Sequence, residues 1–322
     1  PNAYFKTDLN ENIKLGLAIN APFGLKTEYD EEWLGRFQAD MSELKTINFN
    51  PAIAFKLNDQ LSLGLGISAM WAEATLTRAV NLGPFGHGSV KVKGDDWGFG
   101  YNLGAIYQAT ADTRIGIAYR SKVEQHLDGD AKFRRPTNAL PAALLAATAN
   151  GDITADVSLP ASLSFSAFSH LNDKWELMGD ITWTRWSQFE RLAVYRNSGT
   201  LLTETIENWD NTMRYSVGVN YLYSDAIKLR AGLAYDEEAI KDEFRTARIP
   251  GNDRKWISLG ASYQMSPTSK FDVGYAHLFI SDAKIDDDQT AVSAAAPFNN
   301  GRVRGEYEGR VDILSLQYTH NF

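Results

Sequence analysis

The C-terminal segment, residues 312–322, alternates between apolar and polar side chains down to the last residue of the chain. Successive side chains of a β-strand point to opposite faces, so this alternation predicts a strand with one apolar and one polar face. Such a strand fits either the edge of a soluble β-sandwich or a sheet whose apolar face meets lipid. The apolar parity holds Leu314, Leu316, Tyr318 and His320, the polar parity holds Ser315, Gln317, Thr319 and Asn321, and the chain ends on Phe322.

The same period of two recurs along the whole sequence, and no stretch predicts a helical domain. About thirteen segments approach the length that a tilted strand needs to cross a bilayer. An alternating strand that ends in Phe also resembles the C-terminal assembly signal of Gram-negative outer-membrane β-barrels. The segments are residues 2–8, 13–25, 47–57, 61–71, 97–109, 113–124, 156–170, 175–189, 214–223, 227–235, 256–265, 271–279 and 312–322.

The second parity class of these segments is small or polar and includes several charges. A Lys or Arg facing the lipid midplane costs about 2–4 kcal/mol, so these side chains are expected to face a lumen. Glycines of the same parity either leave room in that lumen or relieve packing in the sheet. The charged residues are Arg114, Arg120, Lys122, Glu124, Lys228, Arg230 and Asp236, and the glycines are Gly64, Gly66, Gly98, Gly100 and Gly104.

Connections of two lengths alternate along the chain, as in outer-membrane barrels, where short turns face the periplasm and long loops face outward. The short turns are residues 58–60, 111–112, 172–173 and 224–225, and the long segments are 26–44, 79–96, 127–155, 190–211, 236–254 and 282–305. The sequence therefore predicts an all-β fold: a transmembrane antiparallel up-and-down β-barrel in the bacterial outer membrane, with residues 1–322 as its single domain.

Composition removes several other classes. No run of about 18 apolar residues predicts a helical membrane span. The absence of cysteine excludes disulfides and thiolate metal sites, and a net charge of -8 argues against a nucleic-acid partner. The scattered histidines form no known catalytic motif, so neither an enzyme nor a cofactor or metal site is predicted. Asp286, Asp287 and Asp288 could bind calcium, but they lack a recognisable ligand loop.

Several segments in register resemble the FadL-type outer-membrane transporters of long-chain fatty acids and aromatic hydrocarbons. The resemblance runs in order over essentially the whole chain, although each motif is only moderately specific. The segments are 1–5 (PNAYF), 94–100 (GDDWGFG), 159–161 (LPA) followed by Trp175, 183–189 (WTRWSQF), 229–236 (LRAGLAYD) and 249–256 (IPGNDRKW).

By this resemblance the protein is expected to be a monomeric barrel that takes up long-chain fatty acids or similar hydrophobic molecules. Family members have fourteen strands and an N-terminal hatch in the lumen, and they release ligand sideways at a kinked strand. The sequence matches the family from its second strand onward, so we expect the hatch and the first strand to be missing from it. Either the sequence is a fragment, or its odd count of about thirteen strands closes by a direct pairing. A general diffusion porin for small polar solutes is the alternative.

The predicted strand of residues 13–25 corresponds to the third strand of the family. Pro22 interrupts it, within the segment Ala21, Pro22, Phe23 and Gly24. Proline cannot donate to the ladder and glycine tolerates a bend, so this segment either matches the family's lateral opening or marks the strand's outer end.

Arg78 and Leu76 fall at the outer end of their strand, and Arg78 faces the lumen by parity. Arg78 matches a family arginine that meets the polar head of the ligand, and a guanidinium suits a carboxylate. It could equally be a loop-base arginine paired with a neighbouring carboxylate. A lysine that assists in the family is replaced here by Thr205, which leaves room for an uncharged ligand.

An apolar stretch, residues 139–147, lies in a predicted external loop and contains Leu140, Leu144 and Leu145. Exposed apolar side chains often mark a binding surface, so the stretch could form part of a ligand-capture groove. It could equally be a short helix that caps the barrel mouth. Outer-membrane lipid is an expected partner, and Lys132, Arg134 and Arg135 are either contacts for lipopolysaccharide phosphates or a solvated charge run.

Overall fold

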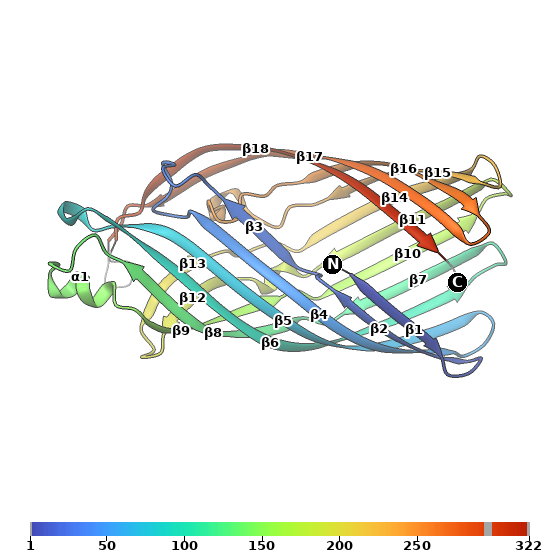
Figure 1. Cartoon of the computed structure of the whole chain (residues 1–322), viewed down its shortest axis with the longest axis horizontal. Helices are drawn as coiled ribbons and strands as arrows, with labels where there is room; N and C mark the ends of the chain where they lie inside the picture. The colour runs from blue at the N-terminus through green and yellow to red at the C-terminus, as the bar shows by residue number, and fades with distance from the viewer. Residues whose placement is uncertain (1, 293–297, 321–322) are drawn as a thin grey trace.

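The computed structural model describes residues 2–292 and 298–320; Pro1, Asn321 and Phe322, on which parts of the terminal motifs rest, lie outside it. The described residues form one antiparallel sheet of 18 strands that wraps around a long axis (Figure 1). The strands are β1 (Ala3–Asp8), β2 (Ile13–Asn20), β3 (Gly24–Glu28), β4 (Met41–Lys56), β5 (Leu61–Asn81), β6 (His87–Gln108), β7 (Thr113–Arg120), β8 (Val123–Arg134), β9 (Gly151–Leu159), β10 (Ser162–His170), β11 (Trp175–Thr184), β12 (Arg191–Arg196), β13 (Leu201–Ile206), β14 (Thr212–Leu222), β15 (Ile227–Asp236), β16 (Arg254–Ser266), β17 (Ser269–Gln289) and β18 (Gly301–His320). The helical elements are α1 (Ala142–Ala147) and the 3-10 turns η1 (Gly83–Phe85), η2 (Trp186–Gln188) and η3 (Asp242–Phe244).

These strands occupy thirteen positions around the sheet, because five positions hold two strands in line. The interrupted positions are β2/β3, β7/β8, β9/β10, β11/β12 and β13/β14. Each position pairs antiparallel with its neighbours in chain order, so the up-and-down topology is confirmed. Within the described residues β1 pairs with β2 and β18 pairs with β17, and no ladder joins β1 to β18.

The outer face of the sheet changes from apolar to charged at one height. In the half of the barrel nearer the short turns, large apolar side chains point away from the lumen. Examples are Ile67, which is 59% exposed, and Phe99, which is 70% exposed. This belt ends near Trp71 and Trp97, which lie opposite each other on β5 and β6. Beyond them the outward positions carry ion pairs such as Lys93–Glu73 at 2.9 Å. The belt therefore marks the membrane-spanning part, and the charged half projects outside it.

The strands extend further outward than expected. Residues 79–96, 127–155 and 282–305 were expected to be loops, but β5, β6, β8, β9, β17 and β18 continue into them. These extensions pair in water, where their outward faces carry charge, so they lack the apolar alternation that reveals a membrane strand. Short turns close the opposite end of the sheet (Figure 1).

The expected inward orientation of Lys122 and Glu124 is wrong. Arg120 faces the lumen, but the break after β7 shifts the alternation by one residue, because the N–H of Ser121 already bonds to the carbonyl of Tyr101. Val123 and Gln125 consequently point inward and are each 1% exposed, while Lys122 and Glu124 pair with each other on the outer face. A single extra residue in a strand reverses the face of every following side chain.

Gly98 lies against the residues that follow the break after β7, where there is no room for a side chain. A Cβ on Gly98 would lie 2.6 Å from Cγ1 of Val123 and 2.7 Å from Nε2 of Gln125. At this position the glycine permits close packing rather than leaving open room, whereas a Cβ on Gly64 would meet only backbone atoms at 3.9 Å.

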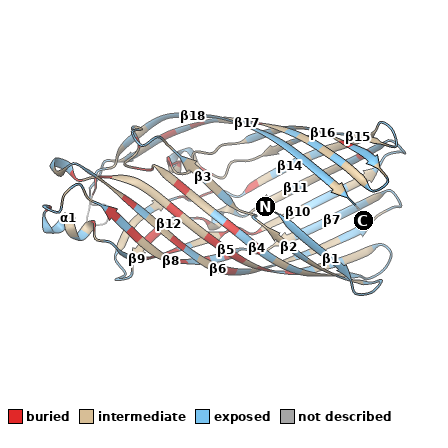
Figure 2. Cartoon of the chain, in the orientation of Figure 1, coloured by how far each residue is buried: buried red, intermediate tan, exposed pale blue. Residues whose placement is uncertain are grey.

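Buried residues gather in the outer half of the barrel, toward α1 (Figure 2). The principal apolar cluster joins β5, β6, β8 and β9 with the loop that precedes α1 and includes Val80, Val90, Leu127, Phe133 and Ile153. The outer half is therefore the more densely packed part of the barrel. No helix among the described residues is long and apolar enough to cross a membrane.

Candidate functional site

A cavity of about 500 Å³ lies inside the outer half of the barrel, beneath α1. This volume is in the range typical of small-molecule sites, roughly 300–1,000 Å³. Its apolar wall comes from the strands, from α1 and from the segment before β18, and its polar wall contains three arginines, Arg78, Arg196 and Arg248. The lining includes Leu76, Val90, Val92, Phe133, Ala143, Ala146, Ala147, Leu192, Leu202, Phe298, Arg78, Arg248, Thr203 and Thr205.

The three arginines are held by neutral groups. Arg78 Nη1 donates to Oδ1 of Asn300 at 2.7 Å and to the carbonyl of Phe37 at 3.3 Å. Arg248 Nη1 donates to Oγ of Ser42 at 3.0 Å, and Nη2 donates to the carbonyl of Gln38 at 2.9 Å. Arg196 donates to the carbonyls of Ala149 at 2.8 Å and Ala147 at 3.0 Å. None of the three guanidinium groups has a carboxylate within ion-pair distance among the described residues, so the cavity presents three positive charges whose ionic partner is absent from its wall.

Arg78 and Arg248 both lie within the influence of Asp40, and the charge of Arg78 also acts on Arg248. Burial lowers the pKa of Arg78 to about 10, and burial together with the charge of Arg78 lowers the pKa of Arg248 to about 10. Both remain protonated at neutral pH. Asp40 acts on both from beyond ion-pair distance; burial raises its pKa, and its Oδ1 has no hydrogen-bond partner among the described residues. An incoming anion would be attracted by both cations.

The apolar loop expected from the sequence forms α1 at the barrel mouth. Leu140 is 8% exposed and belongs to the principal core cluster, and Leu144 and Leu145 pack against that cluster. The cavity lining from α1 comes instead from its alanines. The three leucines thus anchor the helix, while the ligand-binding role predicted for them has no direct counterpart in the lining.

A narrower apolar crevice of about 100 Å³ continues inward from Arg248. Leu25, Leu44, Val157 and Ile249 are among its apolar lining residues. Glu207 also lines it and is 2% exposed, with Oε2 accepting a hydrogen bond from Nε1 of Trp209 at 2.9 Å. Burial raises the pKa of Glu207 to about 7, against the opposing effects of Trp209 and Arg248.

The predicted segment Ala21 to Gly24 interrupts a strand rather than ending one. The strand stops at Asn20 and resumes at Gly24, and both parts pair with β4. In the gap, Oγ1 of Thr46 accepts from the N–H of Phe23 at 3.2 Å and donates to its carbonyl at 2.5 Å. A single side chain thus replaces the ladder bonds lost at Pro22.

An apolar cluster, here called the septum, lies between the outer crevice and the inner lumen at the height of this break. It consists of Met70, Val123 and Leu159, each at most 3% exposed, with Phe23 packed against them. The ring of Phe23 also meets Trp186 edge-on at 6.2 Å. Leu44 and Val157 link the septum to the crevice, and Phe23 borders the lumen on the other side. Phe23 is therefore the side chain between the two compartments.

Sequence reasoning placed Arg78 and Leu76 together, and both line the outer cavity. Thr205 lines it as well, so the residue at the family's lysine position faces the same space. Arg248 was missed: it is one of several arginines in a long outer segment after η3, and no local pattern distinguishes it from a solvated arginine. It supplies a second cation where Thr205 supplies none.

The sequence matches the family described as outer membrane protein transport protein (OMPP1/FadL/TodX) over residues 1–322. The chain is 29% identical over 352 aligned residues to the long-chain fatty acid transport protein of Escherichia coli O6:H1, covering all of this chain and 76% of that protein. It is 32% identical over 307 residues to outer membrane protein P1 of Haemophilus influenzae, covering 86% of this chain but 65% of that protein.

The fold is similar to that of a solved FadL homologue from Pseudomonas aeruginosa. The two agree with a TM-score of 0.90 at 25% identity, over 99% of this chain and 77% of the other. The barrel architecture and the outer-membrane location expected from the sequence are thereby confirmed.

Proposed function

The chain belongs to the OMPP1/FadL/TodX family of outer membrane transport proteins, and on this premise we propose that it carries long-chain fatty acids or similar hydrophobic molecules across the outer membrane. The single observation that carries the proposal is the outer cavity, where three arginines without a carboxylate partner among the described residues border an apolar space. Its role is transport rather than catalysis.

Binding in the outer cavity would suit an amphiphile with a carboxylate head. Each CH₂ group removed from water contributes about 0.8 kcal/mol, which the apolar wall and crevice supply along the tail. Arg78 and Arg248 face the head from one side, and a guanidinium forms strong charge-assisted hydrogen bonds with a carboxylate. The apolar loop around α1 would receive the molecule from outside, with Leu140, Leu144 and Leu145 holding the helix in place.

Release would occur sideways at Ala21 to Gly24. Ligand leaving the crevice meets Phe23, and the adjacent strand break offers the gap in the ladder through which a tail could enter the membrane.

Equilibrium binding tests the head-group assignment. Arg78→Gln and Arg248→Gln should each weaken binding of hexadecanoic acid by about tenfold or more, the equivalent of one charge-assisted hydrogen bond of roughly 1.5–3 kcal/mol. Toluene, a neutral ligand, should bind both variants as it binds the wild type. Arg191→Gln is the matched control, since Arg191 pairs with Glu204 on an exposed surface.

The outcomes separate the candidates. Wild-type binding of toluene without the acid would shift the function to hydrocarbon uptake. Binding of neither, together with permeability to small polar solutes, would identify a porin.

A short cleavable cross-linker between cysteines at Phe23→Cys and Trp186→Cys tests lateral release, in a chain that has no cysteine of its own. The cross-linked protein should bind ligand but fail to deliver it to lipid until the linker is cut. Delivery that continues through the cross-linked protein would contradict the proposed route.

A further inference from the structure

Three basic side chains gather on the outward face of the extended sheet, on β6 and β8. Lys91 lies directly opposite Lys132 across the ladder, and Arg134 follows two residues further out. All three are exposed, whereas Val90 and Phe133, which alternate with them, are buried in the principal apolar cluster. The three cations therefore point away from the barrel, and together they are called the basic patch below.

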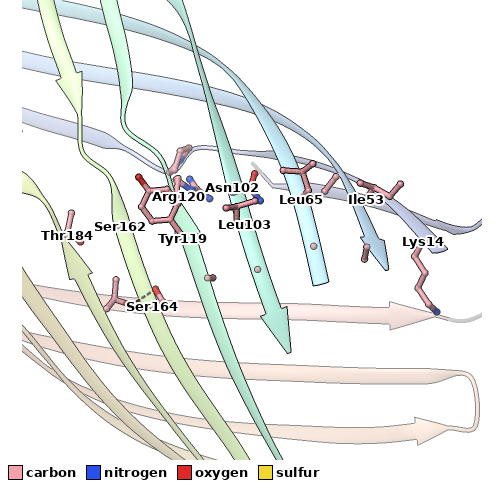
Figure 3. A pocket seen from close by; sticks show the side chains of 18 of the residues that line it. Lys14, Ile53, Leu65, Asn102, Leu103, Tyr119, Arg120, Ser162, Ser164 and Thr184 are labelled. Atoms are coloured by element: carbon pink, nitrogen blue, oxygen red, sulfur yellow. Dashed lines mark hydrogen bonds between the residues drawn. The ribbon is translucent and has the colours of Figure 1, made fainter. Parts of the chain in front are cut away.

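The one-residue shift after β7 turns the β8 cations of this patch outward. Arg120 faces the lumen, where Figure 3 shows it beside Asn102. Without the shift, Lys132 and Arg134 would share the parity of Arg120 and face inward as well. The sequence alone leaves open whether residues 132–135 contact lipopolysaccharide phosphates or are a solvated charge run. Arg135 lies beyond the end of β8 and is half-buried, so it is not part of the patch.

The protein neutralises only part of this charge. Lys132 pairs with Asp130 at 3.0 Å, but the side chains of Lys91 and Arg134 have neither a hydrogen-bond nor an ion-pair partner among the described residues. Because the patch faces away from the lumen, a segment inside the barrel cannot supply that partner. Like charges directly opposite each other on neighbouring strands destabilise a sheet, so Lys91 and Lys132 favour an anion between them.

The height of the patch selects the source of that anion. Lys91 lies six residues beyond Trp97 on β6, which is about 20 Å along the strand and roughly 15 Å above the apolar belt after allowance for tilt. Phospholipid head groups extend only about 5–8 Å beyond the hydrocarbon core, so their phosphates do not reach the patch. The outer leaflet of an outer membrane contains lipopolysaccharide, whose core sugars carry phosphate groups further out.

We propose that the basic patch binds the phosphate groups on the core sugars of lipopolysaccharide. A phosphate monoester carries nearly two negative charges at neutral pH, so its position between Lys91 and Lys132 replaces their repulsion by attraction. The guanidinium of Arg134 can donate two parallel hydrogen bonds to phosphate oxygens. This contact does not depend on what the barrel carries, because the outer cavity lies on the other face of the same strands, where Val90 and Phe133 line it.

Binding of lipopolysaccharide to the purified full chain in detergent micelles, followed by native mass spectrometry, tests the proposal. Two lipopolysaccharides with the same lipid A and the same sugars, with and without core phosphates, isolate the contribution of those phosphates. The wild type should bind the phosphorylated form about tenfold more tightly, and the triple variant Lys91→Gln, Lys132→Gln, Arg134→Gln should lose this preference. Higher salt should weaken the preference, since all three cations are exposed.

Further variants make the result specific. Lys91→Arg with Lys132→Arg keeps both charges and should keep the preference. The triple variant Lys26→Gln, Lys45→Gln, Lys56→Gln is the matched control, because it changes the net charge equally. Each of its lysines already pairs with a carboxylate at 2.7 or 2.8 Å, so the preference should stay within about twofold of wild type. Lys91→Gln alone should reduce the preference about threefold, which keeps the test decisive if the patch triple variant does not fold.

Four results would overturn the proposal. The first is equal binding of the two lipopolysaccharides by the wild type, and the second is a preference that survives in the patch triple variant. The third is an equal loss in the control variant, which would assign the preference to net charge. The fourth is competition by phosphatidylglycerol as effective as that of phosphorylated lipopolysaccharide, which would place the bound phosphate at the membrane boundary rather than on the core sugars.

Discussion

Replacing Glu207 by Gln should stabilise the barrel at alkaline pH and leave it unchanged in acid. Glu207 is 2% exposed, and burial raises its pKa from 4.5 to about 7. The folded state therefore holds this proton more tightly than the unfolded state. The protonated carboxyl of Glu207 therefore contributes to the free energy of unfolding fully below about pH 4.5, and this contribution is lost as pH rises through about 7.

The magnitude follows from the same shift. A raise of about 2.5 pKa units corresponds to about 3 kcal/mol, at roughly 1.4 kcal/mol per unit. Glu207→Gln remains neutral at every pH, and its amide oxygen can still accept from Nε1 of Trp209. The free energy of unfolding of the variant should exceed that of the wild type by about 3 kcal/mol at pH 8, and the difference should shrink toward zero near pH 4.5.

Urea titrations in detergent micelles at several pH values, followed by tryptophan fluorescence, measure this difference. Glu190→Gln is the matched control, since Glu190 is exposed and its carbonyl accepts from the backbone N–H of Glu207 at 2.9 Å. The control should show no pH-dependent gain. A constant offset between Glu207→Gln and wild type across the pH range would refute the reasoning, because it would show that packing rather than ionisation distinguishes them.

Two further substitutions test the strand break and the phase shift. Thr46→Val removes both hydrogen bonds to the backbone of Phe23, so it should lower the free energy of unfolding by about 1–3 kcal/mol. Thr46→Ser keeps the hydroxyl and should retain most of the stability. Equal losses in the two variants would contradict the role of the hydroxyl. Gly98→Ala inserts a Cβ 2.6 Å from Val123 and should lower the free energy of unfolding by about 1–3 kcal/mol in the same titration. Gly64→Ala, whose Cβ would have its nearest atoms at 3.9 Å, should leave the free energy of unfolding nearly unchanged. Similar values for both variants would show that the residues around Gly98 relax freely.

The sequence predicted the fold because lipid imposes a strict rule on every spanning strand. Alternation from Leu61 to Trp71 can satisfy only one arrangement, with apolar residues facing lipid, so parity also placed Arg78 in the lumen. That rule ceases to apply above the belt. The outward side chains there are charged, so the sequence does not distinguish the extensions of β5 and β6 from loops, and the one-residue shift before Val123 leaves no trace in composition.

The outer site could be predicted only where a single strand carried it. Arg78 and Leu76 share β5, and their position on one face follows from the period of two. Arg248 enters the same cavity from a segment after η3, which only the folded chain brings beside Ser42. The alanines of α1, rather than its leucines, face the cavity because a helix docks with its larger side chains against the core.

The charged outer half sets the height at which a hydrophobic molecule leaves water. From Trp71 to the end of β5 the strand runs ten further residues, about 33 Å along its length and roughly 25 Å above the belt after allowance for tilt. On the proposed function, a molecule that entered beneath α1 would be removed from water well before it reached the charged surface of the bilayer. It would cross that hydrated layer inside protein, and its rate of uptake would then depend on dissociation from the lining side chains rather than on partitioning through the bilayer surface.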